Sequence, residues 1–303
     1  MPYEAILPYL PETISRAVAP ILKKDANIEE IRLRTGQPVE LTGTGQHLLQ
    51  VIFTEKERLA FVHKLTKHSF YRLEEQMKKG YITIEGGHRI GLAGQAVLKK
   101  GLIHSMTNLS FFNIRIAREK KGIARHLLPF LYENGWESTL LIGPPRSGKT
   151  TLLRDIARIA ASGQGDYGIP ASKTSIVDER SEIAGCLNGV PQLDVGQRAD
   201  VLDGCPKSEG MMMMIRSMSP ELLIADEIGR TEDAYAMSEA LNAGIAVIAT
   251  VHAHSYEEAI RRPVIREIKE SGLFSRYIDI KPKHEYVVRD LHGRAIKSAP
   301  TFS

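Results

Sequence analysis

The eight residues Gly143–Thr150, GPPRSGKT, constrain this chain more than any other segment. They match the pattern Gly-x-x-x-x-Gly-Lys-Ser/Thr in full, with the apolar run STLLIG before them and the helical run TLLRDIARIA after them. Glycine allows the backbone angles that turn successive N–H groups toward one point at a helix N-terminus, which makes an anion cradle. The segment therefore predicts a phosphate-binding loop between a buried strand and a helix.

Each part of this loop has an expected role. Lys149 is expected to reach the β- and γ-phosphates of ATP, and the Thr150 hydroxyl is expected to coordinate Mg²⁺. The alternative is a plain glycine loop between a strand and a helix, which the complete pattern disfavours. The residues expected to bind ATP are Gly143, Pro144, Pro145, Arg146, Ser147, Gly148, Lys149, Thr150 and Thr151.

After the loop, short continuous apolar runs alternate with helical patterns. The apolar runs are KTSIVD, ELLIAD and IAVIATVH, and TEDAYAMSEALNAG is one of the helical patterns. Such alternation is typical of a mostly parallel sheet with helices on both faces. It predicts an α/β nucleotide-binding domain at residues 131–303, which a β-hairpin with a turn at His292–Gly293 completes.

The residues before the loop have a different pattern, and we expect a smaller α+β domain at residues 1–130. Helical patterns cover residues 3–24 and 54–79, and Thr54 followed by Glu57 fits a helix-capping box. Strand patterns follow in YITIEGG, HRIGLAGQAVL and FFNIRIA, separated by glycine turns. A short amphipathic helix is expected at about Ala124–Asn134. A length of 303 residues is consistent with two domains.

Carboxylates stand at the end of the strand pattern ELLIAD. We expect Asp226 to hold Mg²⁺, directly or through a water molecule, and Glu227 to polarise the water that attacks the γ-phosphate. Two other strand patterns also end in polar residues, with Glu179 in SIVDER and His252 in IAVIATVH. Parallel sheets bind ligands at the carboxyl ends of their strands, so these side chains are expected at one crevice.

Composition limits the remaining possibilities. Hydrophobic residues make up 43% of the chain and charged residues 25%, which is ordinary for a globular protein. No apolar run approaches the roughly 20 residues that a membrane-spanning helix needs, and we expect a cytoplasmic protein. The net charge of +4 comes from basic residues spread along the chain, so nucleic acid is not an expected partner.

The order of motifs resembles that of the ring-forming ATPases of type II and type IV secretion systems. These motifs are the phosphate loop, the box VDER, the apolar strand with an acidic end, and Thr-x-His in ATVH. The resemblance implies a RecA-like P-loop NTPase domain, a smaller N-terminal domain, and a homo-oligomeric ring, a hexamer, with ATP between neighbours. It also implies that Glu227 is the catalytic acid, and that Glu179 and His252 belong to the Asp and His boxes.

Two arginines of the N-terminal region fall where secretion ATPases carry arginines that reach the γ-phosphate. These are Arg89 and Arg115, whose other interpretation is alternate polar residues on an exposed strand face. The chain reads Ala-Asp-Glu-Ile-Gly-Arg where the secretion enzymes favour Gly-Glu-x-Arg-Asp, so the role of Arg230 is open. It also lacks the four-cysteine metal module of some of those enzymes, so we expect no zinc.

Nearly the whole chain resembles a family of sporulation proteins, through SFFNIRIAREKKG, YITIEGGHRIGLAG and VDERSEIAG. The resemblance implies an ATPase in the mother-cell cytoplasm, peripheral to a membrane, that powers or assembles a channel complex needed for spore development. A membrane protein of that complex would be its partner, without direct membrane insertion of this chain. Two alternatives are a RecA-like nucleic-acid translocase, and an ATP-gated assembly scaffold with little turnover.

Overall fold

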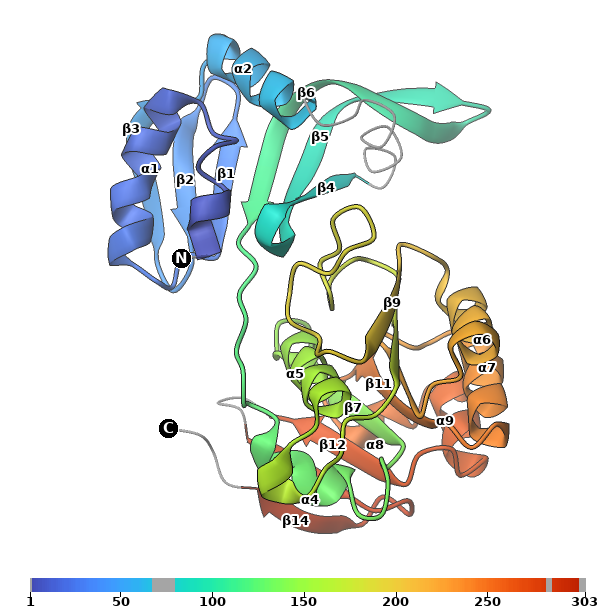
Figure 1. Ribbon diagram of the computed structural model, residues 1–303. Helices are drawn as coiled ribbons and strands as arrows, with labels where there is room; N and C mark the ends of the chain where they lie inside the picture. The colour runs from blue at the N-terminus through green and yellow to red at the C-terminus, as the bar shows by residue number, and fades with distance from the viewer. Residues whose placement is uncertain (1, 67–79, 282–284, 300–303) are drawn as a thin grey trace. The chain divides into compact units, whose positions relative to one another are not determined.

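The chain forms two compact units in the computed structural model, which describes residues 2–66, 80–281 and 285–299 (Figure 1). The first unit is Met1–Arg118 and the second is Glu119–Ser303. This division lies twelve residues before the expected boundary at residue 130. The reason is that Ala124, Leu127 and Leu131 are buried in the hydrophobic core of the second unit.

The first unit is built on a six-stranded antiparallel sheet in the order β3-β2-β1-β6-β5-β4. Its strands are β1 (Glu30–Arg34), β2 (Pro38–Thr42), β3 (Gln46–Ile52), β4 (Tyr81–Ile84), β5 (His88–Lys99) and β6 (Leu102–Arg115). Its helices are η1 (Pro2–Ala5), α1 (Glu12–Lys24), α2 (Glu55–Thr66) and η2 (Glu85–Gly87). A buried cluster of edge-to-face rings from Phe53, Phe61 and Phe112 joins α2 to the sheet. The expected α+β architecture of this region is confirmed.

Two helix predictions in this unit can be compared with the structure. The pattern at residues 3–24 is not one helix, because the extended backbone of Pro11 separates η1 from α1. The capping box at the start of α2 is confirmed: the amide of Thr54 donates to the Glu57 carboxylate at 2.7 Å, and the Glu57 amide donates back at 3.4 Å. The end of the predicted helix, residues 67–79, lies outside the described residues.

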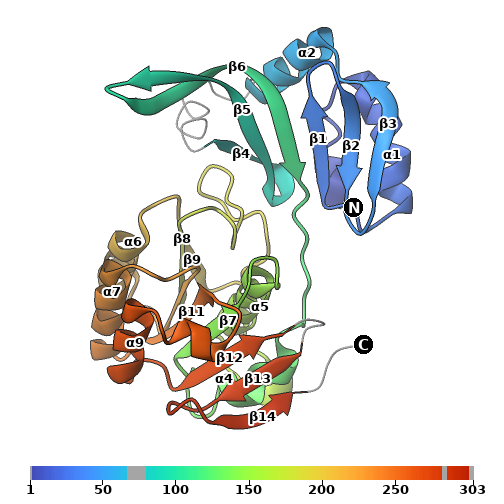
Figure 2. The same ribbon diagram turned by 180° about the vertical axis from the view of Figure 1, so that it is seen from behind.

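The second unit has an eight-stranded sheet in the order β14-β13-β12-β7-β11-β10-β8-β9 (Figures 1 and 2). Strands from β12 to β9 in this order are parallel to their neighbours, and β13 and β14 are antiparallel. The strands are β7 (Thr139–Gly143), β8 (Thr174–Asp178), β9 (Ala199–Asp203), β10 (Leu222–Ala225), β11 (Ala246–His252), β12 (Arg276–Ile280), β13 (Tyr286–Arg289) and β14 (Ala295–Ala299). The predicted α/β fold is confirmed.

Helices cover both faces of this sheet. One hydrophobic core joins a sheet face to α5 and α4, and a second core joins the other face to α6, α7, α8 and α9. The helices are η3 (Arg125–Leu127), α4 (Leu128–Leu131), α5 (Lys149–Ser162), η4 (Gly165–Tyr167), α6 (Lys207–Met218), α7 (Thr231–Asn242), α8 (Tyr256–Ala259) and α9 (Pro263–Glu270). Because β7, β8, β10 and β11 are parallel, their carboxyl ends lie along one edge of the sheet.

Two local predictions for this unit can be compared with its elements, and one strand was not predicted. The helix expected at Ala124–Asn134 is shorter, because the backbone becomes extended at Tyr132 after one turn of α4. Strand β9 was missed within the long segment after VDER. The hairpin near the C-terminus is confirmed: β13 pairs with β14, and Gly293 takes a positive φ of 83° in the turn.

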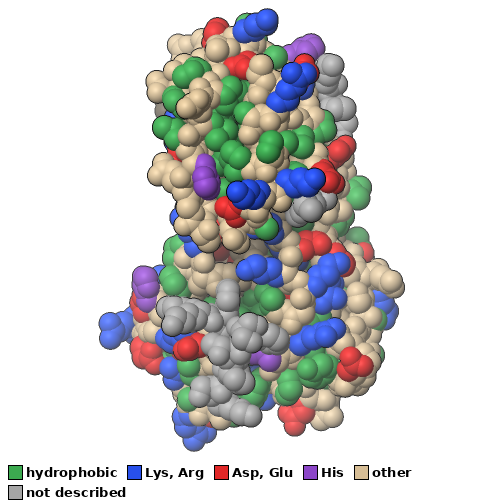
Figure 3. Space-filling model, turned by 90° about the vertical axis from the view of Figure 1, so that its left-hand side faces the viewer, with side chains coloured by type: hydrophobic (Ala, Val, Ile, Leu, Met, Phe, Trp, Pro, Cys, Tyr) green, Lys and Arg blue, Asp and Glu red, His purple; other side chains and the backbone are tan. Residues whose placement is uncertain are grey.

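The surface has charges of both signs. On the face seen in Figure 3, Lys and Arg side chains are interspersed with Asp and Glu side chains, and hydrophobic side chains lie among them. Across the described ranges of the chain, no helix is both long and apolar enough to span a bilayer.

Candidate active site

The phosphate loop joins the end of β7 to the start of α5. Gly148 has a φ of 88°, a left-handed conformation that glycine adopts without strain, and it is the N-cap of α5. A Cβ at Gly143 would lie 2.5 Å from the buried Oγ of Ser147, so the loop closes tightly on itself. That Oγ has no hydrogen-bond partner among the described residues. The first N–H groups of a helix also have no partner within the helix, so the loop presents donors suited to phosphate.

Lys149 is the first residue of α5, and only 4% of it is exposed. Its Nζ donates to the carbonyl of Pro144 at 2.8 Å and lies 2.8 Å from Nδ1 of His252. Burial lowers the pKa of Lys149, and the charges of Asp226 and Glu227 oppose that change. An ammonium group has no acceptor, so Nδ1 of His252 accepts this hydrogen bond and its Nε2 carries the proton.

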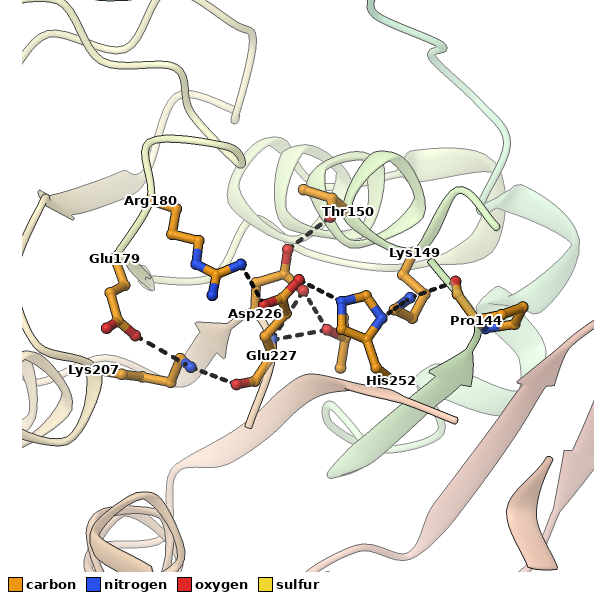
Figure 4. A network of polar contacts seen from close by, with 10 residues as sticks. Pro144, Lys149, Thr150, Glu179, Arg180, Lys207, Asp226, Glu227 and His252 are labelled. Atoms are coloured by element: carbon orange, nitrogen blue, oxygen red, sulfur yellow. Dashed lines mark hydrogen bonds and ion pairs between the residues drawn. The ribbon is translucent and has the colours of Figure 1, made fainter. Parts of the chain in front are cut away.

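The carboxylate of Asp226 connects the loop to two strand ends (Figure 4). The Thr150 hydroxyl donates to Oδ2 of Asp226 at 2.7 Å. The Thr250 hydroxyl of β11 donates to Oδ1, and the amide of Glu227 donates to the same oxygen at 3.0 Å. These contacts bring the predicted metal residues Thr150 and Asp226 together, although 76 positions separate them in the sequence.

The residues present fit a magnesium ion. Mg²⁺ prefers oxygen ligands and needs few from the protein, because phosphate oxygens and water complete its shell. The neighbouring oxygens of Thr150 and Asp226 supply that kind of ligand beside the phosphate loop. The part of the chain that the structure describes has no group of three His, Cys, Asp or Glu side chains suited to a metal ion.

Glu227 lies at the centre of the polar contacts. Its Oε1 is 2.5 Å from Nε2 of His252, and its Oε2 is 2.7 Å from a guanidinium nitrogen of Arg180. Its backbone is left-handed, with a φ of 53°, and its amide also donates to the Thr250 hydroxyl at 2.9 Å. A left-handed conformation is unfavourable for a residue with a Cβ, so the surrounding hydrogen bonds hold Glu227 in it.

The residues of VDER have three different surroundings. Asp178 is buried and accepts hydrogen bonds from the amides of Glu182, Ile183 and Ala184, at 2.8–3.0 Å. Burial raises the pKa of Asp178 to about 6, although those amides favour its charged form. Glu179 is half-buried, and its carboxylate lies 3.4 Å from Nζ of Lys207. Asp178 therefore stabilises the turn itself, whereas Glu179 reaches out of it.

A polar hollow of about 230 Å³ lies at the residues of VDER. Its walls include Asp178, Glu179, Arg180, Lys207, Asp226, Glu227 and Arg230. A larger hollow of about 730 Å³ lies along α6 and α7 and contains none of the predicted site residues. Its walls include Met212, Met213 and Tyr235. We place the candidate site at the smaller hollow, because charged groups from the ends of β8 and β10 and from the start of α6 meet there.

The two N-terminal arginines belong to the first unit. Arg89 of β5 and Arg115 of β6 are directly opposite each other in the antiparallel pair. The guanidinium of Arg89 also lies over the ring of Tyr81, 3.9 Å from its centroid. The predicted role of both arginines in catalysis stays a prediction.

The sequence analysis assigned no role to three residues that contact the acids of the candidate site. Thr250 appeared only within the Thr-x-His motif and Arg180 only within the box VDER, and Lys207 was not noticed at all. A lysine directly after Pro206 at the start of a helix was the available signal for Lys207, since cations are unfavourable at helix N-termini.

Solved structures of other proteins have a fold similar to that of this chain. The ATPase DotB of Legionella pneumophila has a TM-score of 0.60 and 16% identity, over 95% of this chain and 79% of that one. The pilus retraction motor PilT, solved with bound ADP, has a TM-score of 0.60 and 14% identity, over 91% of this chain and 81% of that one. The fold is therefore the one shared by the ATPase DotB and the pilus retraction motor PilT.

The family to which the chain belongs follows from its sequence. The model of the family "Sporulation stage III, protein AA" matches residues 3–292. Stage III sporulation protein AA of Bacillus subtilis (strain 168) is 50% identical over 273 residues, which cover 89% of this chain and 88% of that protein. The chain belongs to this sporulation family, as its sequence resemblance predicted.

Proposed function

We propose that this protein is a Mg²⁺-dependent ATPase that hydrolyses ATP to ADP and phosphate. The contacts among Lys149, Thr150, Asp226, Glu227 and His252 carry the proposal, because they join a phosphate loop to two separately held carboxylates. The same arrangement would be difficult to explain in a protein that only binds nucleotide. Asp226 alone would suffice for magnesium, so the second, separately held carboxylate of Glu227 favours turnover.

Each residue has a distinct part in the proposed reaction. The loop amides and Lys149 bind the phosphates of ATP. Thr150 and Asp226 would hold Mg²⁺, which would supply positive charge against the negative charge that develops on the phosphates. Glu227 polarises the attacking water and accepts its proton. His252 donates from Nε2 to Glu227 and accepts from Lys149 at Nδ1, so it fixes the acid relative to the lysine.

The proposal extends to an assembly. Subunits would form a homo-oligomeric ring, a hexamer, and Arg89 and Arg115 of one subunit would neutralise charge at the γ-phosphate in the active site of its neighbour. The family membership and the fold shared with a pilus retraction motor support a motor that powers or assembles a membrane channel complex in sporulation. The protein would act in the cytoplasm, at the membrane surface, through a membrane-protein partner.

The first experiment measures the ATPase rate per subunit against protein concentration, with and without single-stranded DNA. A rate that rises with concentration and ignores DNA supports active sites shared between subunits. A rate that depends on DNA favours a nucleic-acid translocase, whose binding would also fall steeply with salt. Absence of turnover at every concentration, with ATP binding intact, favours an ATP-gated scaffold.

The catalytic assignment has its own test. Glu227→Gln keeps the shape of the side chain but removes the proton acceptor, so turnover should fall by about a hundredfold or more while ATP still binds. Turnover equal to that of the wild type would refute the role of Glu227 and move the base to Glu179.

A further inference from the structure

Lys207 occupies a position that is unfavourable for a lysine. It is the first residue of α6, it follows Pro206, and only 8% of it is exposed. The N-terminus of a helix carries a partial positive charge, so a cation there is repelled, and burial of the cation adds a desolvation cost. Its contacts must offset both costs.

The two contacts of Lys207 join two strand ends (Figure 4). Its Nζ donates to the backbone carbonyl of Glu227 at 2.6 Å, beyond the end of β10. The same Nζ lies 3.4 Å from Oε2 of Glu179, beyond the end of β8. Neither partner belongs to the phosphate loop. Lys207 thus contacts both residues that are candidates for the catalytic acid, one through its backbone and one through its carboxylate.

The contact with the Glu227 carbonyl matters because of the backbone conformation of Glu227. With a φ of 53°, this residue is in the left-handed region. Its N–H side is held by the Asp226 carboxylate and the Thr250 hydroxyl, and its C=O side is held by Lys207. A change in φ or ψ would swing the carboxylate away from His252. The ammonium of Lys207 is one of the contacts that fix the direction of the Glu227 side chain.

We propose that Lys207 is a positioning residue for hydrolysis, which holds Glu227 and Glu179 in their places without binding ATP itself. The inference rests on the proposed ATPase function. It predicts a separation of effects: loss of the ammonium lowers turnover and leaves nucleotide affinity unchanged, because the phosphate loop and Lys149 are not among its contacts.

Three variants test this proposal. Lys207→Met removes the charge and keeps the length of the side chain, and kcat should fall about tenfold to a hundredfold, the scale of a displaced catalytic group. The Kd and KM for ATP should stay within about twofold. Lys207→Arg restores a charged donor and should recover part of kcat. Lys173→Met is the matched control, because the same change falls on an exposed lysine directly before β8, and it should leave kcat unchanged.

A second measurement does not depend on turnover. The amide of Glu227 donates to Asp226 and Thr250, and the amide of Ile228 donates to the Thr250 carbonyl at 2.9 Å. Hydrogen exchange of the segment around these amides should become faster in Lys207→Met, and stay unchanged in Lys173→Met. A variant that merely loses global stability would show faster exchange throughout α5 and β7 as well.

The outcomes separate this proposal from the ATPase proposal. Wild-type turnover that falls in Glu227→Gln but not in Lys207→Met would overturn the role of Lys207 alone. A wild-type protein without turnover would count against the ATPase function, and the exchange data would then decide whether Lys207 holds the Glu227 backbone. Equal hydrogen exchange around Glu227 in Lys207→Met and in the wild type would overturn the role of Lys207 in holding the Glu227 backbone.

Discussion

The two halves of the candidate site are built in different ways. The phosphate-binding half is one contiguous segment, Gly143–Thr150, whose shape depends on Gly148 and on the close approach of Gly143 to Ser147. The hydrolytic half is assembled from the ends of β8, β10 and β11 and the start of α6. A contiguous segment can carry its function as a motif, whereas the assembled half depends on the sheet that aligns its strands.

This difference predicts different consequences of mutation. Changes in the phosphate loop should remove ATP binding, and turnover with it. Changes in the assembled half should remove turnover and spare binding. Two residues of the assembled half also contact the phosphate loop: Asp226 accepts a hydrogen bond from Thr150, and His252 contacts Lys149 on one ring nitrogen and Glu227 on the other. The predictions below test this division, beginning with the largest expected effect.

Lys149→Ala should have the largest effect, because it removes the charged donor of the phosphate-binding half. Affinity for ATP should fall about a hundredfold, since hydrogen bonds to charged groups contribute on the order of 1.5–3 kcal/mol. Turnover should be lost at every accessible ATP concentration. Binding is measured with a fluorescent ATP analogue, with Lys173→Ala as the control. An affinity within about twofold of the wild type would remove Lys149 from the phosphate site.

Thr250→Val should have an intermediate effect in the assembled half. Valine keeps the shape of threonine but removes the hydroxyl that contacts both Asp226 and the Glu227 amide. We expect kcat to fall about tenfold, and the free energy of unfolding to fall by about 1–3 kcal/mol, because buried polar groups lose a partner. ATP affinity should change little.

The control for Thr250→Val is Thr139→Val, the same replacement at a buried threonine at the other end of β7. The Thr139 hydroxyl donates to the Glu137 carbonyl at 2.7 Å, away from the site. This variant should lose stability without a matching loss of kcat per folded subunit. A loss of ATP affinity in Thr250→Val as large as the loss of kcat would contradict the division into two halves.

The smallest effect concerns the pH dependence of ATP binding. Burial lowers the pKa of Lys149, so in the free protein this lysine loses its charge at a lower pH than an ordinary lysine. Phosphate favours the charged lysine, so affinity should be full below that lowered pKa and fall as the pH rises through it. Titrations of ATP binding from pH 7 upward measure this, on protein shown to stay folded. An affinity that begins to fall only in the ordinary lysine range would contradict it.

Much of the fold could be predicted because its signals are local. The apolar runs that became β7, β8, β10 and β11 are short and continuous, as buried parallel strands require. Strand β9 was missed because its sequence, ADVLD, is only partly buried and has two charged residues. The helix at Ala124–Asn134 was predicted too long, since its helical spacing extends beyond the turn where the chain leaves the helix.

The sequence by itself determined the phosphate loop, the acids at the strand ends and the two-unit organisation, because these depend on neighbouring residues and on strand and helix periodicity. Only the tertiary structure decided which polar groups meet. His252 lies 103 positions from Lys149, and Lys207 lies 20 positions from Glu227. Such contacts depend on strand order, which places β8, β10 and β11 side by side. A hydrogen bond needs a donor and an acceptor within about 3 Å of each other. For residues on different strands, the number of positions between them in the sequence does not give that distance.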